Sequence, residues 1–195
     1  NHSATHLMHK ALKETLGNHI EQKGSLVDRY RTRFDFSHPK PLTPEEKTSI
    51  ELMVNQEILK NQTTQAKVMD IDAAKKTGAM MLFGEKYGDQ VRVLDIGNSK
   101  ELCGGTHVAK TGDIGLFKIQ SESGVSSGVR RIEATTGLNV ISLIKAQETV
   151  LDNVSKELNV SASEIGLKVG QLIKQLKDNE KTINQLKSKI AGSEG

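Results

Sequence analysis

Residues 2–16 read His2-Ser-Ala-Thr-His-Leu-Met-His-Lys-Ala-Leu-Lys-Glu-Thr-Leu16, and this stretch predicts the first structural element of the chain. Its apolar side chains recur about every 3.6 residues, the period of a helix with one buried face: Leu7, Met8, Ala11, Leu12 and Leu16. Gly17 is a typical helix stop, because glycine adopts a positive φ at little cost. We therefore predict a helix over Ser3–Leu16 that packs one face against a core.

The residues that follow this helix, up to about residue 137, show a succession of strand and helix patterns. Residues 19–28 and 30–37 predict two paired strands, and in the second Tyr30, Thr32, Phe34 and Phe36 alternate with charged side chains. Thr43-Pro-Glu-Glu46 has the residues of a capping box and predicts a helix that runs to about Lys60, with Ile50, Met53, Val54 and Leu59 as its apolar residues. Further strands are predicted at 62–69, 90–96, 116–121 and 129–134, and a short helix at 71–76. Strands that are often neighbours in sequence favour an α+β fold with a largely antiparallel sheet and packed helices.

After Gly137 the pattern becomes purely helical. Residues 139–158 predict one helix, and Ser161 or Ser163 caps the next. In that next helix the apolar residues alternate in spacings of 4 and 3, with Asn179 in the skipped position: Ile165, Val169, Leu172, Leu176, Ile183, Leu186 and Ile190. This heptad seam predicts either a helical hairpin with 139–158 or a coiled coil between chains, and nothing in the sequence separates the two. We assign residues 1–137 to one domain and 138–195 to a helical segment.

Two pairs of side chains that can bind a metal have the same spacing. His2 and His6 are four residues apart, as are Cys103 and His107. Residues i and i+4 share one face of a helix, so His2 and His6 can point at one centre. Three imidazoles and one thiolate are a common ligand set for Zn²⁺. The alternative is that these are ordinary histidines and a buried thiol. No Glu follows His2 in a His-Glu-x-x-His pattern and no Cys-x-x-Cys occurs, which argues against a metalloprotease and a zinc finger.

Five ordered motifs carry a resemblance to a known family: Asn1-His-Ser-Ala-Thr-His-Leu7, Gln22-Lys-Gly-Ser25, Leu82-Phe-Gly-Glu-Lys-Tyr-Gly-Asp89, Glu101-Leu-Cys-Gly-Gly-Thr-His107 and Gly128-Val-Arg-Arg-Ile-Glu-Ala134. In order and rough spacing, residues 1–137 resemble the editing domain of alanyl-tRNA synthetases. Free-standing alanyl-tRNA editing proteins share the metal pairs, and threonyl-tRNA synthetases share a related constellation. The resemblance implies hydrolysis of the ester in tRNA(Ala) mischarged with serine or glycine, with Zn²⁺ as the cofactor and the tRNA(Ala) acceptor end as the partner.

The same resemblance implies roles for single residues. Cys103 joins His2, His6 and His107 as metal ligand and is counted among the catalytic residues. Gln22 lies in the pocket strand and hydrogen-bonds substrate or water, while Thr5 reads the serine hydroxyl. Arg130 neutralises the terminal phosphate or the developing oxyanion. The alternatives are a surface role for Gln22 and Thr5 and a structural ion pair for Arg130. Asp95 is a candidate partner of a histidine, although a structural role is favoured, and Gly104 and Gly105 permit a tight turn.

Two mechanisms stay open at this point. Zinc either acidifies the attacking water, which requires an open coordination position, or orients the substrate while water is activated elsewhere. We favour a mixed case, in which the metal positions the substrate and one ligand is weak. Rival classes are a free-standing editing protein, a non-catalytic zinc-stabilised tRNA-binding module and a dimerisation segment. Since a native start would not place a metal ligand at position 2, we expect a fragment of a longer synthetase that lacks the aminoacylation machinery. The seam then leads toward a C-terminal dimerisation region and a homodimer.

The composition excludes several classes of protein. The chain has 195 residues with 3% aromatics and no Trp, so a core must be built mainly from aliphatic side chains. No apolar run of about 18 residues and no secretory pattern occurs. One Cys rules out an intrachain disulfide and fits a reducing compartment, the cytoplasm. A net charge of +3 is too small to indicate nucleic-acid binding by itself.

Overall fold

The computed structural model of the protein describes residues 1–81 and 87–193. It divides the chain into two compact units, Asn1–Ser142 and Leu143–Gly195. Most of the motif that begins at Leu82 lies outside the described residues. The α+β prediction is confirmed, with two sheets whose strands pair antiparallel throughout the described part of the chain.

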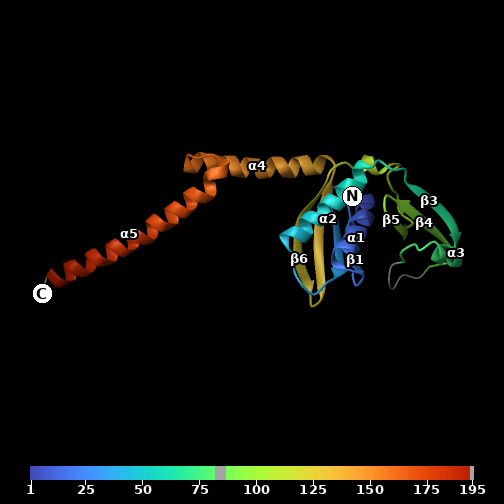
Figure 1. The fold of residues 1–195 in the computed structure, drawn as a ribbon, viewed down its shortest axis with the longest axis horizontal. Coiled ribbons are helices and arrows are strands. Elements are labelled where there is room, and N and C mark those ends of the chain that lie inside the picture. The colour runs from blue at the N-terminus through green and yellow to red at the C-terminus, as the bar shows by residue number, and fades with distance from the viewer. Residues whose placement is uncertain (82–86, 194–195) are drawn as a thin grey trace. The chain divides into compact units, whose positions relative to one another are not determined.

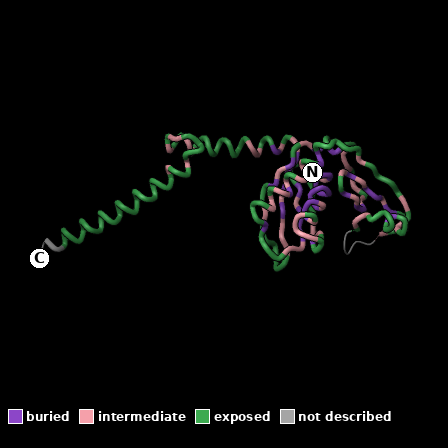
Figure 2. The backbone as a smooth tube through the Cα atoms, viewed as in Figure 1, coloured by how far each residue is buried: buried purple, intermediate pink, exposed green. Residues whose placement is uncertain are grey.

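The larger sheet has the order β1-β2-β7-β6. Its strands are β1 (Gln22–Val27), β2 (Thr32–Ser37), β6 (Phe117–Ser126) and β7 (Val129–Thr136). Helices α1 (His2–Leu16) and α2 (Pro44–Leu59) pack together and on this sheet (Figure 1). The main core forms where the predicted apolar face of α1 meets the alternating residues of β2, including Leu7, Met8, Leu12, Phe34 and Phe36. Figure 2 shows this buried backbone in the first unit.

The smaller sheet has the order β3-β4-β5. It contains β3 (Gln65–Asp70), β4 (Gln90–Ile96) and β5 (Ser99–Leu102), accompanied by helix α3 (Ile71–Lys76). Strand β4 is buried on both faces, because Leu94 and Ile96 enter the main core while Val91 and Val93 form a second, smaller cluster with Ala74 and Leu102. This packing fixes β5 beside α1, and β5 leads directly into Cys103.

Most local predictions are confirmed, with three differences. Thr43 and Glu46 form the expected capping box, and Gly17 ends α1 with φ 114°. Strand β5 was not predicted, since four residues with two charges carry no clear period. Strand β6 extends to Ser126, five residues beyond the predicted end at residue 121. Leu59, predicted as a core residue of α2, is 82% exposed because Ile58 fills the buried position at the helix end instead.

The second unit holds most of α4 (Leu138–Leu158), the 3-10 turn η2 (Ala162–Glu164) and α5 (Ile165–Ser193). Another 3-10 turn, η1 (Thr111–Ile114), belongs to the first unit. Ser161 is the cap at the break, paired with Glu164. The seam residues of α5 that follow Ile165 are exposed, from 37% at Leu172 to 62% at Leu176 (Figure 2). No described residue covers this face, so the hairpin alternative is not observed. No helix among the described residues has the length and apolar character needed to span a bilayer.

Candidate metal and substrate site

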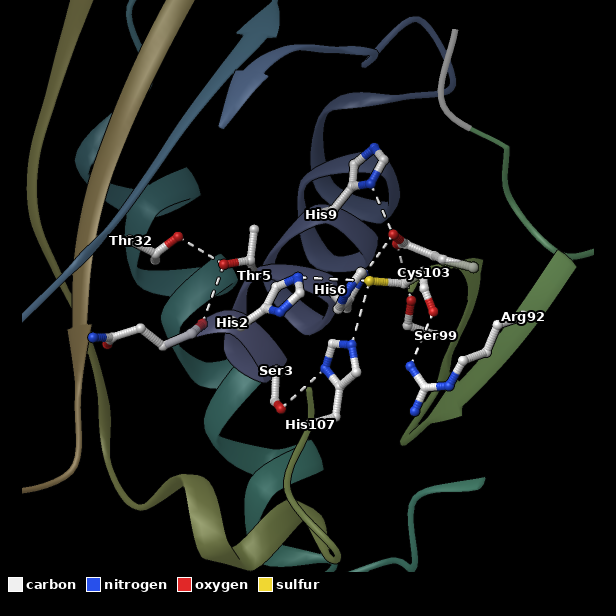
Figure 3. A network of polar contacts seen from close by, with 12 residues as sticks. His2, Ser3, Thr5, His6, His9, Thr32, Arg92, Ser99, Cys103 and His107 are labelled. Carbon is white, nitrogen blue, oxygen red and sulfur yellow. Dashed lines mark hydrogen bonds and ion pairs between the residues drawn. The ribbon is translucent and has the colours of Figure 1, made fainter. Parts of the chain in front are cut away.

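The four predicted metal ligands converge. His2 and His6 lie on the first turns of α1, and Cys103 and His107 follow the end of β5 (Figure 3). One ligand atom from each lies within 4.8 Å of all the others. Cys103 Sγ is 3.3 Å from His107 Nε2 and 3.6 Å from His2 Nε2. Residues a hundred positions apart thus form one cluster, because β5 is held against the start of α1.

The outer nitrogens of two imidazoles are anchored by neighbouring polar groups. His6 Nδ1 lies 2.6 Å from Glu101 Oε2, a buried hydrogen bond. His107 Nδ1 lies 3.3 Å from the hydroxyl of Ser3, which also accepts the Val108 amide at 3.1 Å. Such contacts fix the ring orientation and leave the other nitrogen to act as a ligand. His6 Nε2 is indeed buried without a hydrogen-bond partner among the described residues.

The charges in the cluster favour a deprotonated thiol. Burial raises the pKa of Cys103, but the hydrogen bonds from His107 and His2, together with the nearby His6, outweigh burial and lower that pKa to about 3. Burial likewise raises the pKa of Glu101, yet His6 and His9 bring it down to about 2. The pKa of His6 is lowered by burial and raised more strongly by Cys103 and Glu101, to about 9. A thiolate beside imidazoles is the protonation state in which cysteine binds metal.

The donor set and the packing around it fit a zinc ion. One thiolate and three imidazole nitrogens match the usual ligands, and the unpartnered His6 Nε2 is an orphan that a metal would satisfy. Gly105 lies against the ring of His2, where an added Cβ would come within 2.3 Å of Cε1. Neither Gly104 nor Gly105 has a positive φ, so the backbone conformation there does not itself require glycine. Gly105 is required for the close approach of His2.

A cavity of about 440 Å³ opens beside the cluster. Its walls come from α1 and from both sheets, and they include Gln22, Ser25 and Phe34 on one side and Gln90 and Arg92 on the other. Thr5 and Gln22 therefore line the cavity, as predicted. The Thr5 hydroxyl is already engaged, since it donates to the Asn1 carbonyl at 3.1 Å and lies 2.7 Å from the Thr32 hydroxyl.

Two predicted residues are placed elsewhere. Arg130 is not among the described residues that line the cavity; its Nε donates to Glu122 Oε1 at 2.5 Å, which is the structural ion pair given as the alternative. Asp95 forms an ion pair with Lys100 at 3.2 Å and contacts no histidine ligand among the described residues.

Three residues of the site were missed by the sequence reasoning. Glu101 is the carboxylate partner of His6, and its position two residues before Cys103 was the available signal. Arg92 donates to the carbonyls of Cys103 at 3.0 Å and Gly105 at 2.6 Å, and so holds the ligand loop. His9 lines the cavity one turn after His6. Its spacing from His6 was visible, but only the tertiary structure places it at the cavity.

The chain is similar in sequence to known proteins along its whole length. The family described as threonyl and alanyl tRNA synthetase second additional domain matches residues 91–133. The chain is 59% identical over 195 residues to an alanine–tRNA ligase of Polaromonas sp. (strain JS666) and 58% identical to that of Thiobacillus denitrificans. It is 60% identical over 194 residues to the alanine–tRNA ligase of Methylobacillus flagellatus. Each alignment covers 100% of this chain and 22% of the relative, so the chain spans about one fifth of the length of these relatives.

Proposed function

Because this chain is homologous along its whole length to a segment of the alanine–tRNA ligases, we propose that it hydrolyses the aminoacyl ester of tRNA(Ala) mischarged with serine, and with glycine. The reaction corrects an error that an alanine pocket cannot avoid. Glycine is smaller than alanine, and one added hydroxyl is poorly rejected, so each discrimination is worth only about 1–3 kcal/mol. A second site with the opposite preference removes the wrong ester.

The observation that carries this proposal is the position of the ligand cluster. Cys103, His2 and His6 line a cavity with room for an aminoacyl group, rather than a closed core, and His107 completes the cluster beside them. A structural zinc site would be expected to be sealed by protein, whereas a catalytic site keeps access for substrate or water. The access to the cavity therefore favours chemistry over simple stabilisation.

The chain's own residues suit ester hydrolysis. The three histidines and Cys103 would hold a zinc ion, which when bound supplies a Lewis acid that polarises an oxygen or acidifies water. Gln22 on the cavity wall offers both an amide donor and an acceptor to the ester or to the attacking water. Thr5 and Phe34 close the cavity on the side of the larger sheet. Arg92 keeps the loop that carries Cys103 in place by binding two of its carbonyls.

The partners we propose follow from the same reasoning. The substrate is the acceptor end of tRNA(Ala), whose terminal ribose bears the ester. A second copy of the chain is the proposed partner of α5, since its heptad seam is exposed. The exposed seam thus favours an additional role in self-association, independent of hydrolysis.

The test is deacylation of serine-charged and alanine-charged tRNA(Ala) by this chain. We expect rapid release of serine, slow release of alanine, loss of activity after chelation and recovery on adding zinc. Cys103→Ala should abolish release, while Asp95→Asn, a carboxylate outside the cavity, should leave it unchanged. Release of serine no faster than the spontaneous rate, with zinc bound, would sink the proposal.

A further inference from the structure

His9 is an ionisable residue of the cavity wall to which the proposed hydrolysis assigns no role. It lies on α1 one turn after His6 and is 3% exposed (Figure 3). Its ring packs 5.1 Å from the ring of Phe34, measured between centroids, and both residues line the cavity. The imidazole is therefore held in a fixed orientation between the helix and β2.

The neighbouring carboxylate determines which nitrogen of His9 carries the proton. Nδ1 lies 3.3 Å from Glu101 Oε1, as an ion-pair contact without ideal hydrogen-bond alignment. Glu101 also binds His6 and accepts the Ser99 hydroxyl at 3.1 Å. An ionised carboxylate only accepts, so the nitrogen that faces it carries the hydrogen. In the neutral ring, Nε2 is then a bare acceptor.

The His9 acceptor has no partner. Within residues 1–81 and 87–193, Nε2 is buried and makes no hydrogen bond. A buried polar atom of this kind is normally satisfied, so an unpaired one in a cavity wall indicates a group supplied by the ligand. Among the other described cavity residues, His6 Nε2 shares this condition and is assigned to the metal. The predicted reader of serine, Thr5, already has its hydroxyl engaged by Asn1 and Thr32.

Resting on the proposed function, we propose that His9 Nε2 accepts a hydrogen bond from the side-chain hydroxyl of a seryl ester and thereby separates serine from alanine. Alanine differs from serine only by that hydroxyl, so size alone cannot exclude it. With alanine bound, Nε2 stays buried and unpaired, and a site built to bind a hydroxyl rejects the analogue that lacks it. The cavity thus favours serine over alanine, and equally over glycine, by the cost of leaving His9 unsatisfied, so glycine esters should be released more slowly than serine esters.

The experiment measures binding rather than turnover. Two non-hydrolysable probes, 3′-seryl-amido and 3′-alanyl-amido adenosine, are titrated into the zinc-loaded chain by calorimetry. We expect the wild type to prefer the seryl probe by about 10- to 100-fold. His9→Phe keeps the ring and the packing on Phe34 but removes the acceptor, so the preference should vanish through weaker seryl binding alone. His9→Gln, which places an amide oxygen near the position of Nε2, should restore part of it.

Two controls keep the result specific. The wild type and both variants should contain equal amounts of zinc. A lower zinc content in a variant would show that the substitution had disturbed the metal site. His19→Phe makes the same exchange at an exposed histidine outside the cavity and should keep the full preference. Equal weakening of both probes by His9→Phe, or an unchanged preference, would overturn the assignment. Failure of the proposed hydrolysis is recognised separately, as absent release of serine from charged tRNA by a chain that still binds the seryl probe.

Discussion

The carboxylate of Glu101 binds His6 Nδ1 at 2.6 Å and the Ser99 hydroxyl at 3.1 Å, and it lies 3.3 Å from His9 Nδ1. One buried side chain therefore orients a proposed metal ligand, His6, and a cavity residue, His9, at once. A partner of this kind fixes the tautomer of the imidazole and makes its other nitrogen a better ligand.

We predict that Glu101→Gln lowers the affinity for zinc by about 10- to 100-fold, the usual cost of removing a carboxylate behind a histidine ligand. The amide preserves the shape of the side chain but not its charge. Competition with a chelator of known affinity measures the change. Asp95→Asn, on the neighbouring strand β4 and paired with Lys100, is the matched control and should bind zinc normally. An unchanged affinity in Glu101→Gln would show that His6 is oriented by α1 alone.

Gly105 allows a steric test of whether His2 binds the metal. An added Cβ there would lie 2.3 Å from His2 Cε1, while at Gly104 nothing lies within 4 Å. Gly105→Ala should therefore displace the ring of His2 and reduce bound zinc below one per chain. Gly104→Ala should bind zinc as the wild type does. Elemental analysis of both proteins decides the matter, and equal zinc in the two variants would argue against His2 as a ligand.

Asp35 and Arg131 form a bidentate pair across β2 and β7, with contacts of 2.7 and 2.8 Å. The hydrogen bonds from Arg131 hold the pKa of Asp35 below its usual value. The stability that follows is fully present above the unfolded pKa of about 3.9 and is lost as the pH falls through the lower folded pKa.

Asp35→Asn should therefore cost about 1–3 kcal/mol at pH 7. The difference between wild type and variant should shrink as the pH is lowered from about 5 toward 2. Urea unfolding at a series of pH values measures both quantities. A difference that stays constant below pH 4 would show that the charge of Asp35 is not the stabilising feature.

At the scale of elements, α5 combines a regular heptad seam with exposure of that seam to solvent. Leu172, Leu176 and Leu186 are 37%, 62% and 53% exposed. Burying a Leu side chain is worth about 1.5–3 kcal/mol, so several such residues in water favour association. The skipped position, Asn179, is polar, and such a residue can set the register of a coiled coil at some cost in stability.

We predict that Leu186→Asp reduces self-association and tail helicity while hydrolysis of serine-charged tRNA continues. The metal cluster and cavity are built from the first unit, so the reaction should not need α5. Gln185→Asp introduces the same charge one position off the seam and should change neither property strongly. Sedimentation, circular dichroism and deacylation on the same samples test this. Parallel loss of helicity and activity would show one cooperative unit instead of two.

At the scale of the whole molecule, the ligands of the proposed zinc tie together segments that are distant in sequence. His2 and His6 begin the chain, and Cys103 and His107 follow β5. A metal that binds only the folded state stabilises it by about 4 kcal/mol when its free concentration is a thousand times Kd. We predict that chelation lowers the unfolding temperature of the first unit and leaves the helical signal of the tail unaffected. Calorimetry of Cys103→Ala should resemble that of the chelated wild type. Zinc that shifts both transitions equally would contradict this.

Local features of the chain were readable from the sequence alone. Each of these features depends on residues only a few positions apart, because the backbone of a helix or strand places such residues on one face. They are the apolar face from Leu7 to Leu16, the Thr43 cap, the strand at 90–96 and the heptad seam from Ile165. The four candidate metal ligands were also predicted from their spacing and the family resemblance, and the structure brings them together. The spacing of residues along the chain could not show which side chains from distant segments meet in the folded protein. The packing of β5 on α1 brings Glu101 to His6, which lies 95 positions away in the sequence, and places His9 at the cavity. The register of β6 on β7 sets Arg130 against Glu122.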